Sequence, residues 1–258
     1  MTILFHEIVY GPLHSRRMGS SLGVNLLPYD GKLCSFDCIY CECGFNKDFR
    51  TKTKLPDRKL VKAALADKLQ LLREEGVKLD VITFAGNGEP TMHPEFAGII
   101  ADTLEMRNRY YPETGISVLS NGMHISKKAV FDALRKVDNP ILKLDSAFDE
   151  TVRLIDRPNA PSYRVAKQVA QYKKFQGNFI LQTMFLKGVF EGKEIDNTTE
   201  EEISAWLELV KALQPREVMI YTIDRETPAS GLEKIPLAVL QTIAARVSES
   251  GIKTNVAG

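Results

Sequence analysis

Short apolar runs alternate with longer amphipathic stretches along most of this chain, and that alternation restricts the fold more than any other feature. Six of the runs are rich in Val, Ile, Leu and Phe, as strands covered on both faces usually are: residues 22–27, 81–85, 116–119, 141–144, 179–185 and 218–223. Helical patterns lie between and after them, at residues 61–75, from Pro94 onward, and at 127–136, 163–175, 199–213 and 237–248.

Strands and helices that alternate in this way form right-handed βαβ units around a parallel sheet. Six units are too few for the closed barrel of eight strands. We therefore predict an α/β fold with a partial (β/α)6 TIM-like barrel, and a flat doubly wound sheet is the alternative. In either fold ligands bind beyond the C-terminal ends of the strands, so the residues that follow each strand are the candidates for a site.

The size and composition of the chain indicate one domain. Its 258 residues, 44% of them hydrophobic, can bury one substantial core. We expect an N-terminal extension at 1–20, the barrel core at 21–224, and a C-terminal helix and tail at 225–258. The net charge of +1 gives no general attraction to nucleic acid or membranes. No apolar run reaches the roughly 18 residues that span a bilayer, and the first ten residues do not resemble a secretion signal, so we expect a cytoplasmic protein that does not bind membranes.

All four cysteines fall within ten residues, at Cys34, Cys38, Cys41 and Cys43. A disulfide framework would spread them along the chain, whereas clustered thiols in a reducing compartment more often bind a metal. Three thiolates on one short loop can hold three corners of a cubane cluster and leave the fourth iron open. A structural zinc site and the cluster of an electron-transfer ferredoxin each need four ligands, and Cys43 would have to be the fourth. We favour Cys34, Cys38 and Cys41 as the metal ligands and take Cys43 as non-ligating.

The spacing Cys-x3-Cys-x-aromatic-Cys, with Tyr40 as the aromatic residue, resembles the signature of the radical S-adenosylmethionine (SAM) superfamily. The strings at 10–25 and 34–44 resemble one branch of it, the small and largely uncharacterised Fe-S oxidoreductases related to wyosine-type tRNA-modifying enzymes. This resemblance extends to about Asp224 and is strongest before residue 92. It implies an enzyme with a barrel of the radical SAM type and with a [4Fe-4S] cluster and SAM as cofactors.

The resemblance also implies a mechanism. An electron donor such as flavodoxin or ferredoxin would reduce the cluster, and one electron would cleave the sulfonium of SAM into methionine and a 5′-deoxyadenosyl radical. That radical would abstract hydrogen from a substrate. The substrate itself is not implied: we expect an RNA base or a small metabolite, with a tRNA or a protein as the partner. The alternatives are an activase that installs a glycyl radical on a partner enzyme and, more remotely, a non-catalytic zinc-binding protein.

The second motif follows the second predicted strand and reads Gly86-Asn87-Gly88-Glu89. Its glycines allow close approach of the backbone to a ligand, and a carboxylate there suits the ammonium group of an amino acid. An ordinary glycine-rich turn is the alternative. The string resembles the Gly-Gly-Glu element of the family, which binds the amino group of SAM, although it carries Asn87 and Gly88 where two adjacent glycines often stand.

Polar residues at the ends of the later strands complete the candidate cofactor site. These are Ser120, Asn121, Asp145 and Gln182, with Tyr40 in the cysteine motif. Ser120 and Asn121 could contact SAM or form a plain Asn-Gly turn. Strand alternation points Asp145 to the same side as Lys143, where the two could form an ion pair or face the barrel mouth.

Candidates for a substrate pocket are Arg16, Arg17, Asn25, Lys143 and Tyr221. The pair of arginines could clamp a phosphate or carboxylate, or could simply be solvated. Residues 47–62 carry seven lysines and arginines against two aspartates, which indicates a solvated face or a phosphate-binding patch. Arg153, Asp156 and Arg157 follow the fourth strand and could line the mouth or pair with one another.

Overall fold

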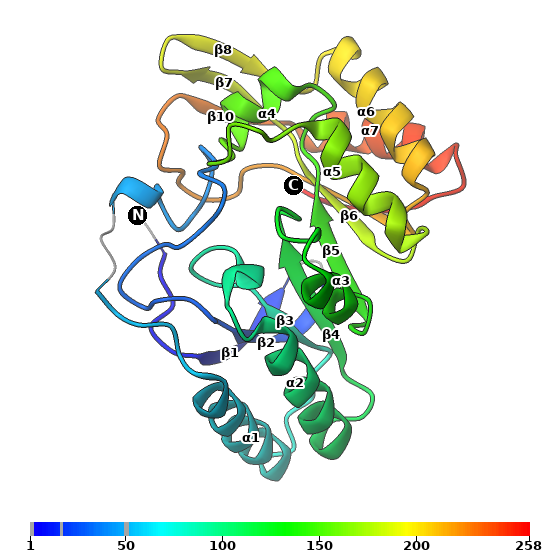
Figure 1. The fold of residues 1–258 in the computed structure, drawn as a ribbon. Helices are drawn as coiled ribbons and strands as arrows, with labels where there is room; N and C mark the ends of the chain where they lie inside the picture. The colour runs from blue at the N-terminus through cyan, green and yellow to red at the C-terminus, as the bar shows by residue number, and fades with distance from the viewer. Residues whose placement is uncertain (1–2, 16–17, 49–51) are drawn as a thin grey trace. The chain divides into compact units, whose positions relative to one another are not determined.

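The computed structural model describes residues 3–15, 18–48 and 52–258, and these divide into two compact units. The N-terminal unit comprises Leu4–Cys34 and Asn46–Pro140. The C-terminal unit comprises Ser35–Phe45 and Ile141–Gly258, together with Ile3. Each unit contributes its own strands and helices (Figure 1), and eight of the strands form one sheet in the order β1-β2-β3-β4-β5-β6-β9-β11. The segment with the cysteines contributes to both units, since Cys34 belongs to the first and the later cysteines to the second.

The N-terminal unit is built on four strands in the order β1-β2-β3-β4. Their bounds are β1 Val9–Ser15, β2 Gly19–Val24, β3 Val81–Phe84 and β4 Gly115–Ser120. Strand β1 is antiparallel to β2, and β2, β3 and β4 are parallel, with Leu22, Ile82 and Ile116 in register. These three side chains are completely buried, which explains why the strands appear in the sequence as continuous apolar runs.

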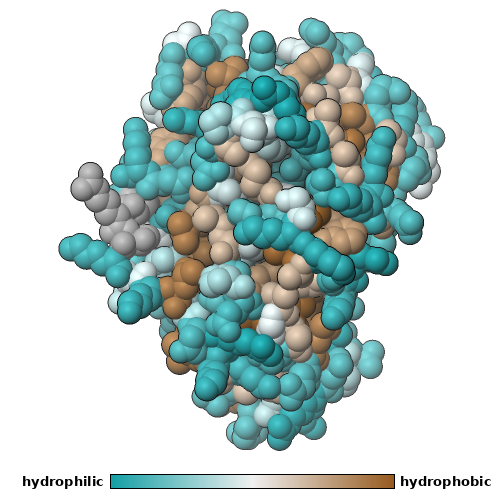
Figure 2. Space-filling model, in the orientation of Figure 1, coloured by the Kyte–Doolittle hydropathy of each residue, from teal (hydrophilic) through white to brown (hydrophobic). Residues whose placement is uncertain are grey.

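Three helices follow these strands: α1 Arg58–Glu74, α2 Phe96–Tyr110 and α3 Lys128–Leu134. Helix α1 begins at the N-cap Asp57, whose carboxylate accepts a hydrogen bond of 2.8 Å from the Leu60 amide. It buries one stripe of residues at helical spacing, namely Val61, Leu65, Leu69 and Leu72. Helices α1 and α2 pack side by side, and Figure 2 shows hydrophilic residues over them at the foot of the view.

The C-terminal unit contains four parallel strands in the order β5-β6-β9-β11 and a small antiparallel sheet in the order β10-β7-β8. The strand bounds are β5 Asn139–Lys143, β6 Ile180–Met184, β7 Leu186–Phe190, β8 Lys193–Asp196, β9 Glu217–Tyr221, β10 Leu232–Lys234 and β11 Lys253–Ala257. The helices are α4 Asp149–Ile155, α5 Val165–Tyr172, α6 Glu200–Leu213 and α7 Leu237–Ser248. In its core the Phe185 and Trp206 rings pack edge to face, with their centroids 5.3 Å apart.

The six predicted strands correspond to β2, β3, β4, β5, β6 and β9, and the helical predictions to α1, α2, α3, α5, α6 and α7. Helix α7 has the predicted bounds. The sequence reasoning missed β1, β7, β8, β10, β11 and helix α4. Most of these are short elements with few buried residues: α4 buries only Val152 and Ile155, and β11 has no fully buried residue. Such elements lack the apolar periodicity on which sequence prediction depends.

The division into an N-terminal extension, a barrel core and a C-terminal tail stays a prediction. Residues 9–15 form β1, and residues 253–257 add a parallel strand beside β9. In the described part of the chain, no helix combines the length and the apolar character that crossing a lipid bilayer requires.

Candidate cofactor site

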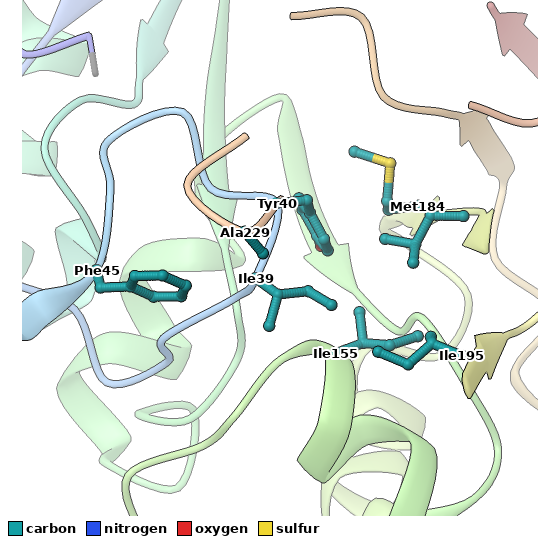
Figure 3. Packing of buried hydrophobic residues seen from close by; sticks show 8 residues of the cluster. Ile39, Tyr40, Phe45, Ile155, Met184, Ile195 and Ala229 are labelled. Carbon is teal, nitrogen blue, oxygen red and sulfur yellow. The ribbon is translucent and has the colours of Figure 1, made fainter. Parts of the chain in front are cut away.

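The segment that carries Cys38 and Cys41 is anchored to the C-terminal unit by the residues between and after them. Ile39 is completely buried, and Tyr40 and Phe45 are each 9% exposed. Figure 3 shows Ile39 close to Ile155, whose carbonyl accepts a 2.9 Å hydrogen bond from the Ile39 amide. Apolar side chains therefore hold this loop in place while the neighbouring thiols remain partly accessible.

The four cysteines differ in burial. Cys34, Cys38 and Cys41 are half-buried, whereas Cys43 is 8% exposed, and none of the four forms a disulfide. The Cys41 amide donates to the Cys38 carbonyl at 3.1 Å, which folds the segment between the two into a turn. Within residues 3–15, 18–48 and 52–258, no group of three His, Cys, Asp or Glu side chains is arranged as metal ligands would be.

The chemistry of the donor set nevertheless fits an iron-sulfur cluster. Thiolate sulfur is the soft ligand that such clusters use, and three of the four thiols are accessible. In the N-terminal unit the Asn121 side-chain amide donates to the Cys34 sulfur, with Nδ2 and Sγ 3.6 Å apart. Asn46 Nδ2 donates to the Cys34 carbonyl at 3.2 Å. Donors to the sulfur and the backbone hold Cys34 in one orientation and stabilise negative charge on it.

The Gly86–Glu89 motif positions the chain just before Cys34. The Leu33 amide donates to the Asn87 carbonyl at 2.8 Å, and the Glu89 amide donates to the Leu33 carbonyl at 3.1 Å. Gly88 lies between these two bonds with φ of 137°, and a Cβ atom there would come within 2.0 Å of the Leu33 carbonyl oxygen. Only glycine permits this approach, so the motif fixes the position of Leu33 and its neighbour Cys34.

Glu89 is buried, at 2% exposure, and it joins the loops after β3 and β4. Its Oε1 accepts from the Thr91 amide at 3.1 Å, from the Thr91 hydroxyl at 2.5 Å and from the Ser120 hydroxyl at 2.8 Å. Its Oε2 accepts from the Asn121 amide at 2.7 Å. A carboxylate oxygen has two lone pairs, so Oε1 is saturated whereas Oε2 can accept one more donor. Burial raises the pKa of Glu89 even though these donors act in the opposite direction.

Asn25 and Asn87 form hydrogen bonds inside the protein. The Asn87 side chain accepts from the Phe5 amide and donates to the carbonyls of Phe5 and Pro28, each at 2.8 Å. Asn25 Oδ1 accepts from the Asn87 amide at 3.1 Å, and a Cβ atom on Gly86 would lie 2.4 Å from that oxygen. In the structure these residues set the shape of the Gly86–Glu89 loop. The assignment of Asn25 to a substrate pocket, and of Gly86 and Asn87 to cofactor contacts, stays a prediction.

A network of buried charges surrounds Lys143 at the end of β5. The ammonium group contacts Asp145 Oδ2 and lies 3.1 Å from Asp156 Oδ1. The Tyr40 hydroxyl donates to Asp145 Oδ2 at 2.5 Å, and the Met184 amide donates to Asp145 Oδ1 at 3.0 Å. The ion pair between Lys143 and Asp145, which was the alternative to a role at the barrel mouth, is thus present, and Asp156, which the sequence placed in a loop with two arginines, pairs with Lys143. The assignment of Lys143 to a substrate pocket and of Asp145 and Tyr40 to cofactor binding stays a prediction.

The two carboxylates determine the charge on Lys143. Burial by itself would lower the pKa of Lys143, but Asp145 and Asp156 outweigh it and raise that pKa well above its ordinary value. The side chain is therefore a fixed cation. Burial, and then the nearby Asp145 carboxylate, raises the pKa of Asp156 to about 8. The Cys38 sulfur lies 3.5 Å from Asp156 Oδ1 and completes the network.

The remaining candidates include Tyr221, which is near enough to Lys143 to raise its pKa, and residues outside the described part of the chain. Gln182 on β6 and Tyr221 on β9 are half-buried, and their backbone carbonyls accept hydrogen bonds from neighbouring segments. Arg16 and Arg17 lie outside the described residues. Their assignments stay predictions, as does the contact of Ser120 with SAM.

Arg58 and Lys62, two of the seven basic residues at 47–62, are paired with acidic residues within the protein. Arg58 binds Asp102 with two hydrogen bonds, of 2.6 Å and 2.9 Å. Lys62 lies 2.9 Å from Glu105 and 3.5 Å from Asp102. These acidic partners are far along the sequence on α2, so the sequence overstated the local excess of positive charge.

Sequence reasoning missed Thr91 as a partner of Glu89, and Asp156 as a neighbour of Cys38. Thr91 could have been found, because a threonine two residues after a buried carboxylate often donates to it. For Asp156 there was no signal, since 118 residues separate it from Cys38.

Two relatives of known sequence show how much of the chain is shared. A protein named GTPase Obg from Brachyspira hyodysenteriae is 29% identical over 223 residues, which cover 85% of this chain and 30% of that protein. A UPF0026 protein from Methanocaldococcus jannaschii is 27% identical over 247 residues, covering 94% of this chain and 71% of the relative. The chain thus spans less than a third of the first relative's length.

Solved structures share the fold. A radical SAM methyltransferase from Sphaerobacter thermophilus superposes with a TM-score of 0.68 at 16% identity, covering 92% of this chain and 65% of that one. A TYW1 structure with a lysine-pyruvate adduct bound superposes with a TM-score of 0.59 at 13% identity, covering 89% and 73%. At these identities the likeness concerns the fold alone. It confirms the α/β class and the partial barrel of the radical SAM type, in place of a flat doubly wound sheet.

The sequence profile of the radical SAM superfamily matches residues 30–201, well over half of the 258 residues and a range that includes the cysteine motif and Glu89. Enzymes of that superfamily use a [4Fe-4S] cluster and SAM. The predicted family, its enzymatic character and its two cofactors are thereby confirmed at the level of the family: this chain belongs to the radical SAM superfamily.

Proposed function

We propose that this chain is a radical SAM enzyme that abstracts a hydrogen atom from an RNA base or a small metabolite. The observation that carries the proposal is the set of three accessible thiols, Cys34, Cys38 and Cys41, at the family's spacing and inside the segment that the superfamily profile matches. When bound, a [4Fe-4S] cluster with SAM supplies the one-electron cleavage that yields a 5′-deoxyadenosyl radical.

The three cysteines would hold three irons and leave the fourth open to SAM. The burial of Ile39 and the Asn121 amide near the Cys34 sulfur restrict the motion of the ligands. Cys43 is buried and would not bind the cluster.

Glu89 would bind the ammonium group of SAM through Oε2, the oxygen that retains acceptor capacity. All its hydrogen-bond donors among the described residues are uncharged, so the buried carboxylate has no cation from the protein beside it there. An ammonium group would supply that charge in a site of low dielectric constant, where the attraction is strong. Ser120 and Asn121, which Glu89 holds in place, would then lie beside the bound amino acid.

The protein also needs a reductant, because the cleavage consumes one electron per SAM. A small one-electron carrier such as flavodoxin or ferredoxin would supply it.

The substrate is proposed only by class. The pairing of Arg58 and Lys62 with acidic residues weakens the support for an extended phosphate-binding patch, so a small metabolite and an RNA base are both retained for the test.

Anaerobic reconstitution tests the proposal directly. The purified chain should bind about four irons and four sulfides, show the absorption and EPR signals of a [4Fe-4S] cluster, and release 5′-deoxyadenosine from SAM when reduced. Cys38→Ser should lose the cluster and the turnover. Cys43→Ser is the matched control, two residues from a ligand, and should retain both. One tightly bound zinc per chain with no iron, or a cluster that survives in Cys38→Ser, would contradict the proposal.

The substrate class is tested by stimulation of the same reaction. Release of 5′-deoxyadenosine would be measured with total cellular RNA and, separately, with a fraction of cell metabolites below about 1 kDa. Stimulation by RNA that nuclease treatment abolishes would identify an RNA substrate, and stimulation by the small-molecule fraction alone would identify a metabolite.

A further inference from the structure

The structure places one buried cation between two buried carboxylates next to a proposed cluster ligand. The Lys143 side chain is 13% exposed, and those of Asp145 and Asp156 are 0% and 2% exposed. Its ammonium group contacts both carboxylates and lies 4.5 Å from the centre of the Tyr40 ring. Solvent therefore screens this charge only weakly.

A single oxygen joins Lys143 to the cysteine segment. Asp156 Oδ1 lies 3.1 Å from the Lys143 ammonium and 3.5 Å from the Cys38 sulfur. The backbone reinforces this contact, because the Asp37 amide donates to the Asp156 carbonyl at 3.0 Å and the Ile39 amide donates to the Ile155 carbonyl at 2.9 Å. The C-terminal end of α4 is thus tied to the residues on both sides of Cys38.

The two carboxylates are not held in the same way. Asp145 has further donors in the Tyr40 hydroxyl and the Met184 amide, and these would keep it in place without the lysine. The Asp156 carboxyl contacts Lys143 and Cys38 and shares a hydrogen bond with Asp145. Without the cation, Asp156 loses its contact with the Lys143 ammonium group, and because it has fewer other donors than Asp145, Asp156 is the one that would move.

We propose that Lys143 is a positioning residue for the cluster, which holds Asp156 against Cys38 and places a fixed positive charge near that ligand. The inference depends on the proposed function, since it takes Cys38 as a ligand. The potential of an iron-sulfur cluster depends on the net charge around it and on hydrogen bonds to its sulfurs. A buried cation close to one of the thiolates stabilises the more negative, reduced state, and so makes the cluster easier to reduce.

The test is a redox titration of the reconstituted protein, followed by EPR. Lys143→Gln keeps hydrogen-bonding capacity and removes the charge, and Lys143→Arg keeps the charge. At the wild-type midpoint potential, the ratio of reduced to oxidised cluster should fall about tenfold in Lys143→Gln, which is about 59 mV for a one-electron couple. Lys143→Arg should stay close to the wild type.

Lys187→Gln is the matched control. It removes the same charge from the same unit, but from a side chain that is 45% exposed and 3.4 Å from Glu233. Solvent screens that pair, so the titration should be unchanged. Circular dichroism and iron content establish that each variant is folded and loaded before its potential is compared.

A second variant decides the question should Lys143→Gln fail to fold. Asp145→Asn leaves the cation in place and removes one of the charges that compensate it, so the reduced fraction should rise. The inference would be overturned if folded Lys143→Gln had the same midpoint potential as the wild type. It would also be overturned if the reduced fraction of the cluster did not rise in Asp145→Asn. Failure of the wild type itself to assemble a cluster would overturn the proposed function as well, and the two failures are thereby distinguished.

Discussion

The two units bury carboxylates in opposite ways. In the N-terminal unit, Glu89 is surrounded by uncharged donors from Thr91, Ser120 and Asn121. In the C-terminal unit, Asp145 and Asp156 share the ammonium group of Lys143. Both groups lie at the C-terminal ends of parallel strands, and both were predicted in part from the same kind of sequence signal.

The difference indicates what each site can do. Hydroxyl and amide donors orient Glu89 but do not neutralise it, so a cationic ligand gains a full charge interaction there. The carboxylates near Lys143 already have a cation, and an arriving ammonium group would have to displace it. The first site is therefore suited to binding, whereas the second is suited to holding its own residues in place.

The largest effect is expected when the cation is removed from the second site. Lys143→Met leaves the buried pair of Asp145 and Asp156 without its cation, and breaking a buried ion pair in this way costs about 3–5 kcal/mol. Urea unfolding of the apo-protein measures the loss. The double variant Lys143→Met with Asp145→Asn should recover part of it, because one of the stranded charges is then gone. A loss below about 1 kcal/mol would mean that water reaches this site and that the contrast between the two sites is false.

A smaller effect on stability is expected at the first site. In Glu89→Gln the amide nitrogen takes the place of Oε2 and faces the Asn121 amide, so one hydrogen bond is lost and a donor is left unsatisfied, at a cost of about 1–3 kcal/mol. The same variant should lose affinity for SAM, measured by calorimetry on the loaded protein. Glu113→Gln, an exposed position in the same unit, is the control for both measurements. Unchanged SAM affinity would show that Glu89 serves the structure alone.

The pH dependence of stability provides a third comparison. Burial raises the pKa of Glu89 above its ordinary value of 4.5, so the folded protein holds this proton more tightly than the unfolded chain does. Stability should therefore fall as the pH rises from about 4.5 through the raised pKa of the folded state. Subtracting the unfolding free energies of Glu89→Gln from those of the wild type isolates this component. A difference that stays flat, or that grows with pH, would show that the hydrogen bonds outweigh the burial.

An ion pair whose cation is partly exposed provides the baseline, with the smallest expected effect. Arg58 and Asp102 form two hydrogen bonds, but the arginine side chain is 43% exposed. Arg58→Ala should lower the free energy of unfolding by no more than about 1 kcal/mol, and 1 M salt should reduce that difference. A loss as large as that of Lys143→Met would remove the distinction between screened and buried pairs.

Sequence reasoning was most successful where a residue's role depends on its neighbours along the chain. The cysteine spacing, the Gly86–Glu89 string and the buried strands such as β3 all have short-range patterns, and each was located to within a few residues. It was least successful with edge elements such as β8 and β11, whose polar residues carry no apolar period. Its assignment of Asn25 to a substrate pocket and of Asn87 to cofactor binding stays a prediction, and both side chains hydrogen-bond within the N-terminal unit.

The sequence by itself determined the family, the parallel α/β units and the candidate ligands, because hydrophobic periodicity and motif spacing are local properties of the chain. Only the tertiary structure decided which charges meet. Lys143 pairs with Asp156, and Cys38, which is 118 residues away in the sequence, lies next to the same carboxyl group. Arg58 is neutralised by Asp102 on α2. Pairings of this kind depend on how the strands and helices pack, and no short window of sequence contains both partners.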